Sequence, residues 1–165
     1  MKHQHAEHGQ HSAQGKGHYL KLAAMIVLSF LAMYALMYAM VDRFANVYNN
    51  VNQFYMAGLM VAPMLVIELV LMWHMYPDRK INSVLLAIGV IAGIAFWCLI
   101  RQQAAVSESQ FYRSMIPHHA GAILMCEQRK TDSADVARLC GEIIKSQKAE
   151  VAQMKVRLGE APDAE

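Results

Sequence analysis

The sequence has few charged residues, which make up 17% of its 165 residues, whereas hydrophobic residues make up 56%. A charged share well below the usual quarter is typical of membrane proteins. Neither sign of charge dominates, because the formal net charge is only +2. So small a balance gives no reason to expect a nucleic-acid partner, and the length fits one domain.

The sequence also lacks the short motifs of common catalytic and metal sites. Its three cysteines, Cys98, Cys126 and Cys140, form no CxxC pair, which excludes a zinc ribbon and a thioredoxin motif. No phosphate loop, cofactor fingerprint or nucleophile–base pair is present. We therefore expect a protein that is not an enzyme. Methionine, in contrast, is abundant, with 13 residues.

Three long apolar runs follow a polar, histidine-rich start. Residues 1–18 show no apolar periodicity and are predicted to be a disordered tail. The runs at 19–41, 55–76 and 81–100 each reach the roughly 20 residues that a helix needs to cross a bilayer. Together they predict a three-helix transmembrane domain over 19–101, so the lipid bilayer is an expected partner.

Basic residues beside these runs predict their orientation. Two lysines flank the start of the first run, and Arg79 and Lys80 stand in the second connection, whereas the first connection has only Arg43. Lysine and arginine in short loops favour the cytoplasmic side. We therefore expect the N-terminus and the second connection in the cytoplasm, and the C-terminal part on the other side of the membrane.

The segment 107–158 is predicted to form a helical hairpin. The residues SESQ at 107–110 resemble a capping box with Ser107 as N-cap, which predicts a helix to about Lys130. The residues TDS at 131–133 provide a turn and an N-cap for a second helix, which Gly159 would end. Residues 159–165 are left as a C-terminal tail.

Polar side chains interrupt the apolar stripes of this hairpin. Burying them without partners costs on the order of several kcal/mol, so they need each other or a ligand. Imidazole and thioether together suit Cu(I), and Ag(I) by chemical analogy. A buried His–Glu hydrogen bond in a methionine-packed seam is the alternative. The candidate metal ligands are His118, His119, Met115, Met125, Cys126, Gln147, Glu150 and Met154.

The segments FYRSMIPHHAGAILM and EIIKSQKAEVAQM resemble the family called "domain of unknown function 305". The matching positions are Phe111, Met115, Pro117, His118, His119, Met125, Ile143, Ile144, Gln147, Glu150 and Met154. The resemblance implies a ferritin-like bundle in a bacterial envelope that binds copper or silver, or confers tolerance to them. Family members resemble two copies of the hairpin, whereas this chain has one. We therefore expect two chains to pair into a four-helix bundle, as a homo-oligomer.

Methionines also recur every four residues in the second run, which keeps their side chains near one face of a helix. Such a ladder predicts a relay for a soft ion, although methionine often simply packs in apolar helices. The candidate relay residues are Met33, Met37, Met56, Met60, Met64, Glu68 and Met72.

Two further features of the predicted spans concern packing. Glu68 needs a pathway, a proton or a partner such as Tyr34, Tyr38 or Asn82, because an ionisable residue within a span is costly. In the third run, GxxxG at 89–93 predicts helix packing.

The tail and the hairpin cysteines leave alternatives open. The histidines His3, His5, His8 and His11 form a candidate weak metal site, although a solvated linker is the commoner role of such a tail. Cys126 and Cys140 lie at comparable distances from the turn of the hairpin, and either a disulfide or thiolate ligation is consistent with that spacing.

The sequence thus predicts a membrane-anchored copper-binding protein for metal handling or resistance, with a copper donor or acceptor protein as partner. The alternative is a structural or assembly protein that oligomerises through its hairpin without metal.

Overall fold

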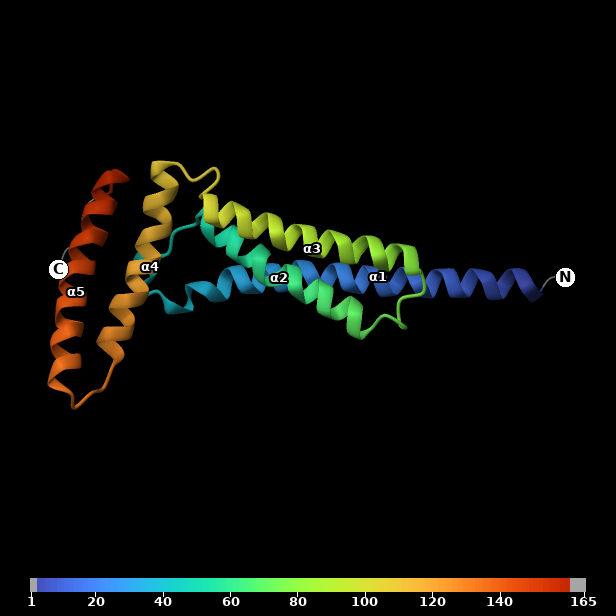
Figure 1. Cartoon of the computed structure of the whole chain (residues 1–165), viewed down its shortest axis with the longest axis horizontal. Coiled ribbons are helices and arrows are strands. Elements are labelled where there is room, and N and C mark those ends of the chain that lie inside the picture. The colour runs from blue at the N-terminus through green and yellow to red at the C-terminus, as the bar shows by residue number, and fades with distance from the viewer. Residues whose placement is uncertain (1–2, 161–165) are drawn as a thin grey trace. The chain divides into compact units, whose positions relative to one another are not determined.

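A computed structural model describes residues 3–160 of the chain, with side chains from Gly17 onward. Over this range the protein is all-α, as predicted, and contains no strand (Figure 1). In chain order the elements are α1 (His3–Leu36), the 3-10 helices η1 (Met37–Met40) and η2 (Phe44–Asn46), α2 (Val51–Leu71), α3 (Arg79–Gln102), α4 (Glu108–Gln128) and α5 (Ala134–Arg157).

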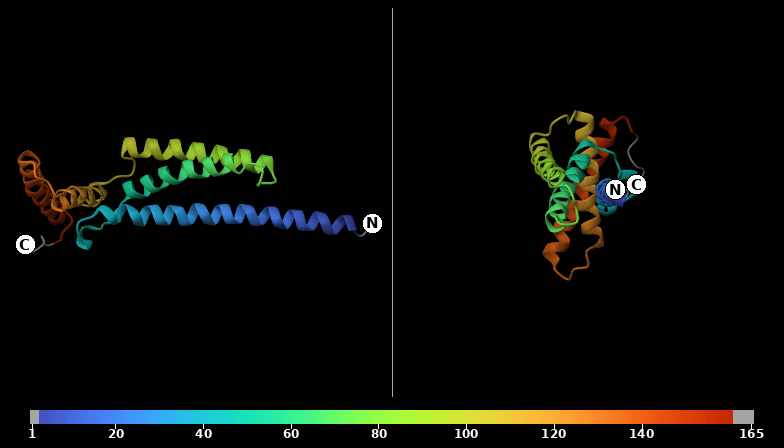
Figure 2. Two further views of the ribbon diagram at one scale, coloured as in Figure 1. Left: turned by 90° about the horizontal axis from the view of Figure 1, so that it is seen from below. Right: turned by 90° about the vertical axis from the view of Figure 1, so that its right-hand side faces the viewer.

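The chain divides into two compact units. The spanning unit contains the residues up to Tyr34 together with Tyr55–Gln102, and the hairpin unit contains Ala35–Phe54 together with the residues from Gln103 onward. Three helical segments of the described chain are long and apolar enough to cross a membrane: Gly17–Met40, Val51–Leu71 and Arg79–Gln102. Within the spanning unit, α1, α2 and α3 run alongside one another in alternating directions (Figure 2).

The bounds of helices α1 and α2 differ from those of the predicted spans. The backbone of α1 begins at His3, before the expected start at Tyr19, because a helix extends one residue at a time without a new nucleation step. The side chains of the tail histidines lie outside the described side chains, so their metal site stays a prediction. Helix α2 ends at Leu71 rather than Tyr76, and Tyr76 packs with Leu22 and Leu69 in the core of the spanning unit.

Side-chain caps fix where α2 to α5 begin. Asn50, Asp78, Ser107 and Ser133 each accept a hydrogen bond from a backbone N–H two or three residues ahead, at 2.8 to 3.4 Å. Such caps satisfy N–H groups that have no partner inside the helix. The predicted caps of the hairpin are thereby confirmed. Gly159, with φ of +81°, follows α5, and a left-handed backbone there favours glycine.

Glycines allow the helices of the spanning unit to approach closely. A Cβ added to Gly58 would overlap the ring of Phe96, and one added to Gly89 would lie 3.0 Å from the side chain of Val66. Gly93 lies in ordinary contact distance of Ala62. The predicted GxxxG packing is therefore confirmed, and its partner is α2 of the same chain.

The connection between the first two spans, residues 37–54, is folded. Its two 3-10 helices contact α4, and a Cβ added to Gly121 of α4 would lie 3.4 Å from the carbonyl oxygen of Met40. The Val51 N–H donates to Gln110 Oε1 at 3.0 Å, and the Tyr48 hydroxyl donates to Glu160. The connection follows the first span and the hairpin follows the third, so both lie on the same side of a membrane. Contact between them requires this arrangement.

Candidate functional site: the seam between α4 and α5

Helices α4 and α5 form the predicted antiparallel hairpin, joined by a turn at residues 129–133 (Figure 1). Its core consists of Ile116 from α4 with Val151 and Met154 from α5. Met115 and Tyr48 are half-buried and pack against this core. Tyr48 comes from the connection, so the chain itself covers part of the apolar surface for which we expected a second hairpin.

The histidine of the seam is His119, which is 8% exposed. Its Nδ1 lies 2.8 Å from the carbonyl oxygen of Met115, and its Nε2 lies 2.7 Å from Glu150 Oε2. A carbonyl oxygen only accepts, so Nδ1 must carry a proton. The hydrogen bond between Nε2 and Glu150 takes one proton, from the ring or from the carboxyl group. A cation that binds Nε2 would replace this hydrogen bond.

Two methionines lie one helical turn from this pair. Met115 precedes His119 by four residues, and Met154 follows Glu150 by four, a spacing that places side chains on one helix face. Both methionines belong to the same apolar cluster. We call Met115, His119, Glu150 and Met154 the seam cluster. It combines one imidazole, two thioethers and one carboxylate, and its Glu150 side chain is 49% exposed.

The other candidate ligands of the hairpin lie outside the seam cluster. His118 is exposed and Met125 is 57% exposed, so neither side chain lies in the seam between α4 and α5. Successive residues point about 100° apart around a helix, and burial of His119 therefore turns His118 outward. Gln147 is half-buried on α5, one turn before Glu150.

The donor set of the seam decides what it can bind. Among the described residues, no group of three or more His, Cys, Asp or Glu side chains is placed to hold a metal ion. An ion at His119 would therefore need methionine sulfur, or a group from another molecule, to complete its ligands. Sulfur ligands of this kind select soft cations.

Cys126 lies further along α4, close to Cys140 of α5. Both cysteines are free and half-buried. A hydrogen bond from the Cys126 thiol to the Cys140 side chain, with a smaller contribution from burial, raises the pKa of the Cys126 thiol, and Arg129 opposes this shift. The thiol form of Cys126 is thus favoured, and its neighbour is a second thiol rather than the seam histidine.

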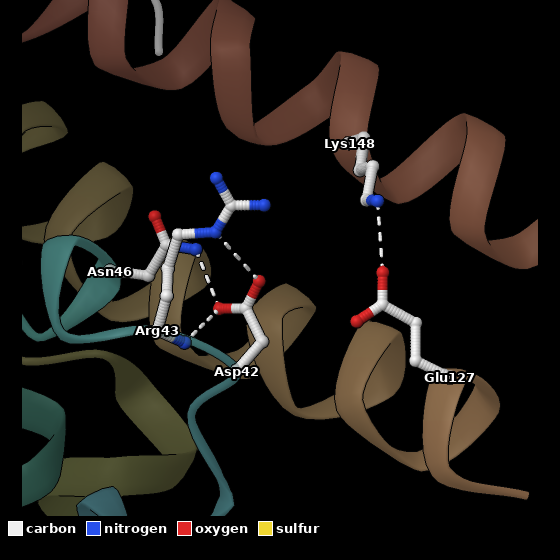
Figure 3. Close-up of polar contacts among 5 residues, drawn as sticks. All are labelled: Asp42, Arg43, Asn46, Glu127 and Lys148. Carbon is white, nitrogen blue, oxygen red and sulfur yellow. Dashed lines mark hydrogen bonds and ion pairs between the residues drawn. The ribbon is translucent and has the colours of Figure 1, made fainter. Parts of the chain in front are cut away.

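Polar contacts that the sequence did not reveal hold the seam in place (Figure 3). Asp42 Oδ1 accepts hydrogen bonds from the Arg43 backbone N–H at 2.8 Å and from Asn46 Nδ2 at 2.7 Å, which shapes the connection. Lys148 Nζ lies 2.9 Å from Glu127 Oε1 and links the two arms of the hairpin. The partners within the connection are near neighbours, but nothing in their sequence distinguishes them from an ordinary polar loop.

The candidate relay residues divide between the two units. Met56 and Met60 are exposed on α2, and Met33, Met64 and Met72 are half-buried. Met37 lies in η1, near the end of the first candidate span, and belongs to the hairpin unit.

Glu68 lies in the last turn of α2 rather than near mid-span, because α2 ends early. Its Oε1 accepts a hydrogen bond from the Tyr76 hydroxyl at 3.3 Å. This partner was not among the three residues proposed from the sequence. Asn82, one of those three, is fully buried and instead accepts a 2.7 Å hydrogen bond from the Tyr19 hydroxyl.

Comparison with known proteins identifies the family. Residues 98–158 match the family model described as a domain of unknown function (DUF305). The chain is 32% identical to "Uncharacterized protein L153" of Acanthamoeba polyphaga mimivirus over 139 residues, which cover 82% of this chain and 90% of that protein. No solved structure matches the chain. The chain belongs to the DUF305 family, as its hairpin motif predicted, and the likeness to the viral protein extends beyond the matched domain into the spanning unit.

Proposed function

We propose that this protein is a membrane-anchored copper-binding protein whose seam cluster takes up Cu(I), and Ag(I) by chemical analogy, as cargo. The observation that supports this most is the placement of His119. Its ring is anchored through Nδ1 to the Met115 carbonyl oxygen, and its Nε2 faces a carboxylate in a seam that two methionines line.

The anchoring hydrogen bond has the form that supports metal-binding histidines, in which the second ring N–H bonds to a carbonyl or carboxylate. Loss of the hydrogen bond to Glu150 would leave the Nε2 lone pair available to a cation in the seam. Thioether sulfur of Met115 and Met154 carries no proton and suits a soft ion. Glu150 is half exposed, so it can move aside while its negative charge stays close to the cation. We leave Cys126 out of this site because it pairs with Cys140.

We place the seam outside the cytoplasm of a bacterium, with the N-terminus inside and the spans in the inner membrane. The support is the distribution of basic residues, since Arg79 and Lys80 follow the second span and the first connection carries only Arg43. Copper would then be held on the extracytoplasmic side and passed to or from a partner protein.

We also propose that a second copy of the chain covers the outer stripe of α4. Phe111 and Met125 are 45% and 57% exposed there, and Leu139 of α5 is 55% exposed. Large apolar side chains outside the membrane favour contact with another protein surface. His118 lies on the same stripe and would come close to the partner copy.

Copper binding is tested on the full chain purified in detergent micelles. The protein is loaded with Cu(I) under reducing conditions, competed with a Cu(I) chelator, and assayed for metal per chain. We expect about one retained copper, which His119→Ala removes and His118→Ala leaves in place. Met154→Leu keeps the volume of the side chain and removes its sulfur, so a weaker affinity in this variant separates ligation from folding.

Two outcomes would contradict the proposal. Near-zero copper in the wild-type protein would favour the alternative of an assembly protein without metal. Equal copper in the wild type and in His119→Ala would place the ion elsewhere. A relay through the spans makes a separate demand, because Met60→Leu or Met64→Leu should then slow copper flux into vesicles without changing the copper bound by the hairpin.

A further inference from the structure

The hairpin unit contains a second reactive pair besides the seam cluster. We propose that Cys126 and Cys140 form a reversible disulfide that closes the hairpin next to its turn. The proposal does not depend on copper binding, and its test requires no metal.

The register of the hairpin places the two cysteines within one helical turn of each other on facing sides of α4 and α5. His119 of α4 faces Glu150 of α5 at 2.7 Å. On α4, Cys126 lies seven residues, or about two helical turns, closer to the hairpin loop than His119. On α5, Ile143 lies the same distance closer to the loop than Glu150, so Ile143 faces Cys126. Cys140 lies one turn beyond Ile143, on the same face of α5.

The surroundings of the two thiols agree with this register. Interaction with the Cys140 side chain is the main cause that raises the pKa of the Cys126 thiol, which agrees with two thiols that face each other across the hairpin. Both residues are free and half-buried, so a small oxidant can reach them while the helices hold them in place. Both also lie outside the membrane-spanning segments.

The reaction is a thiol–disulfide exchange with a small-molecule disulfide as oxidant, here oxidised glutathione. One cysteine, as thiolate, attacks a sulfur of the oxidant and releases one glutathione thiolate, which takes up a proton. The second cysteine then loses its proton and attacks the mixed disulfide, which releases the second glutathione. The protein loses two electrons and two protons, and the oxidant gains them.

The disulfide would stabilise the end of the hairpin near the loop, where the two arms are joined by weak contacts. Near the turn, the Glu127–Lys148 ion pair at 2.9 Å joins the arms, with both side chains partly exposed (Figure 3). A covalent link between Cys126 and Cys140 would prevent α4 and α5 from sliding past each other. The His119–Glu150 contact would then keep its register even when the hairpin loosens.

The experiment uses the full chain in detergent micelles, with Cys98→Ser to remove the third cysteine. The protein is equilibrated with mixtures of oxidised and reduced glutathione, alkylated and digested with trypsin without reduction. Trypsin cleaves after Arg129, Lys130 and Arg138, all between the two cysteines. The disulfide therefore appears as residues 114–129 joined to residues 139–145, on a chain of monomer mass.

Native proximity makes a quantitative prediction. The linked peptide should persist to about tenfold higher reduced glutathione in the folded protein than in denaturant, because the fold holds the two sulfur atoms together. Cys140→Ser must abolish it. The proposal is overturned if both thiols remain alkylatable under oxidising conditions, if the link joins two chains, or if folding gives no advantage over the denatured chain.

Discussion

The spanning unit and the hairpin unit hold their helices together by different means. In the spanning unit, contact depends on missing side chains, because Gly58 and Gly89 let α2 and α3 approach each other. In the hairpin unit, contact depends on large apolar side chains such as Ile116 and on polar bonds such as His119–Glu150.

This difference follows from the surroundings of each unit. Lipid is as apolar as the helices that it surrounds, so moving apolar side chains from lipid into a helix interface gains little free energy. Close contact between helix backbones supplies van der Waals attraction instead. Water outside the membrane makes burial of apolar side chains favourable.

The largest expected effect tests the core of the hairpin. Ile116 is fully buried, and Ile116→Ala should destabilise the hairpin by about 2–5 kcal/mol, because it removes apolar contacts and leaves a cavity. Hydrogen exchange of α4 and α5 amides in the full chain measures this loss. Val156→Ala, at an exposed site on α5, is the matched control and should change protection little. Equal effects of the two variants would show that Ile116 is not part of a packed core.

The next prediction tests packing through glycine. Gly58→Ala forces the Phe96 ring to move and should destabilise the spanning unit by about 1–3 kcal/mol, the usual range for overpacking. Unfolding in mixed micelles measures it. Gly141→Ala provides the opposite sign, because its Cβ meets nothing within 4 Å and alanine favours a helix by roughly 0.5–1 kcal/mol. A tolerated Gly58→Ala would mean that α2 and α3 are not packed through this glycine.

A smaller effect tests the link between the connection and the hairpin. Gln110→Ala removes the acceptor of the Val51 N–H and should cost about 1 kcal/mol, the typical net value of such a hydrogen bond. Faster exchange of the Val51 amide, with the α5 amides unchanged, is the expected result. Unchanged exchange at Val51 would place the start of α2 away from α4.

The smallest effect is expected at the ion pair between the hairpin arms. Lys148→Met removes the charge that faces Glu127 while it keeps a long apolar side chain. Because both partners are partly exposed, the loss should be about 0.2–1 kcal/mol and should shrink in high salt. Thermal unfolding at low and high salt measures it. A larger loss that salt does not alter would indicate that packing, not charge, is the contribution of Lys148.

Sequence reasoning located the elements and missed one set of contacts. Apolar run lengths predicted three spans, and the cap chemistry of Ser107 predicted the start of α4, because both signals are local. The contacts of the connection are not local, since Val51 and Gln110 are 59 residues apart. The asparagine-rich connection has the composition of an ordinary loop, and its contacts with α4 cannot be predicted from nearby residues.

The same limit applied to the two histidines of the motif. Helical spacing predicted both His118 and His119 as metal ligands of the seam, because adjacent residues lie only about 100° apart around a helix. In the structure the connection covers one flank of α4, close to Gly121, while His119 reaches Glu150 on α5. Glu68 was likewise paired with the wrong candidates, because Tyr76 lies beyond the end of α2 and was counted as part of the span.

The folded connection has a consequence for how the chain is made. Residues 37–54 emerge from the ribosome well before α4, so Asn46 and Asn50, both buried in the finished protein, must remain hydrated until their cover arrives. That cover reaches the correct side only after the third span has inserted. If the third span failed to insert, α4 would lie on the opposite side of the membrane from residues 37–54, and the hairpin unit could not form. Folding of the hairpin unit therefore requires the correct membrane topology.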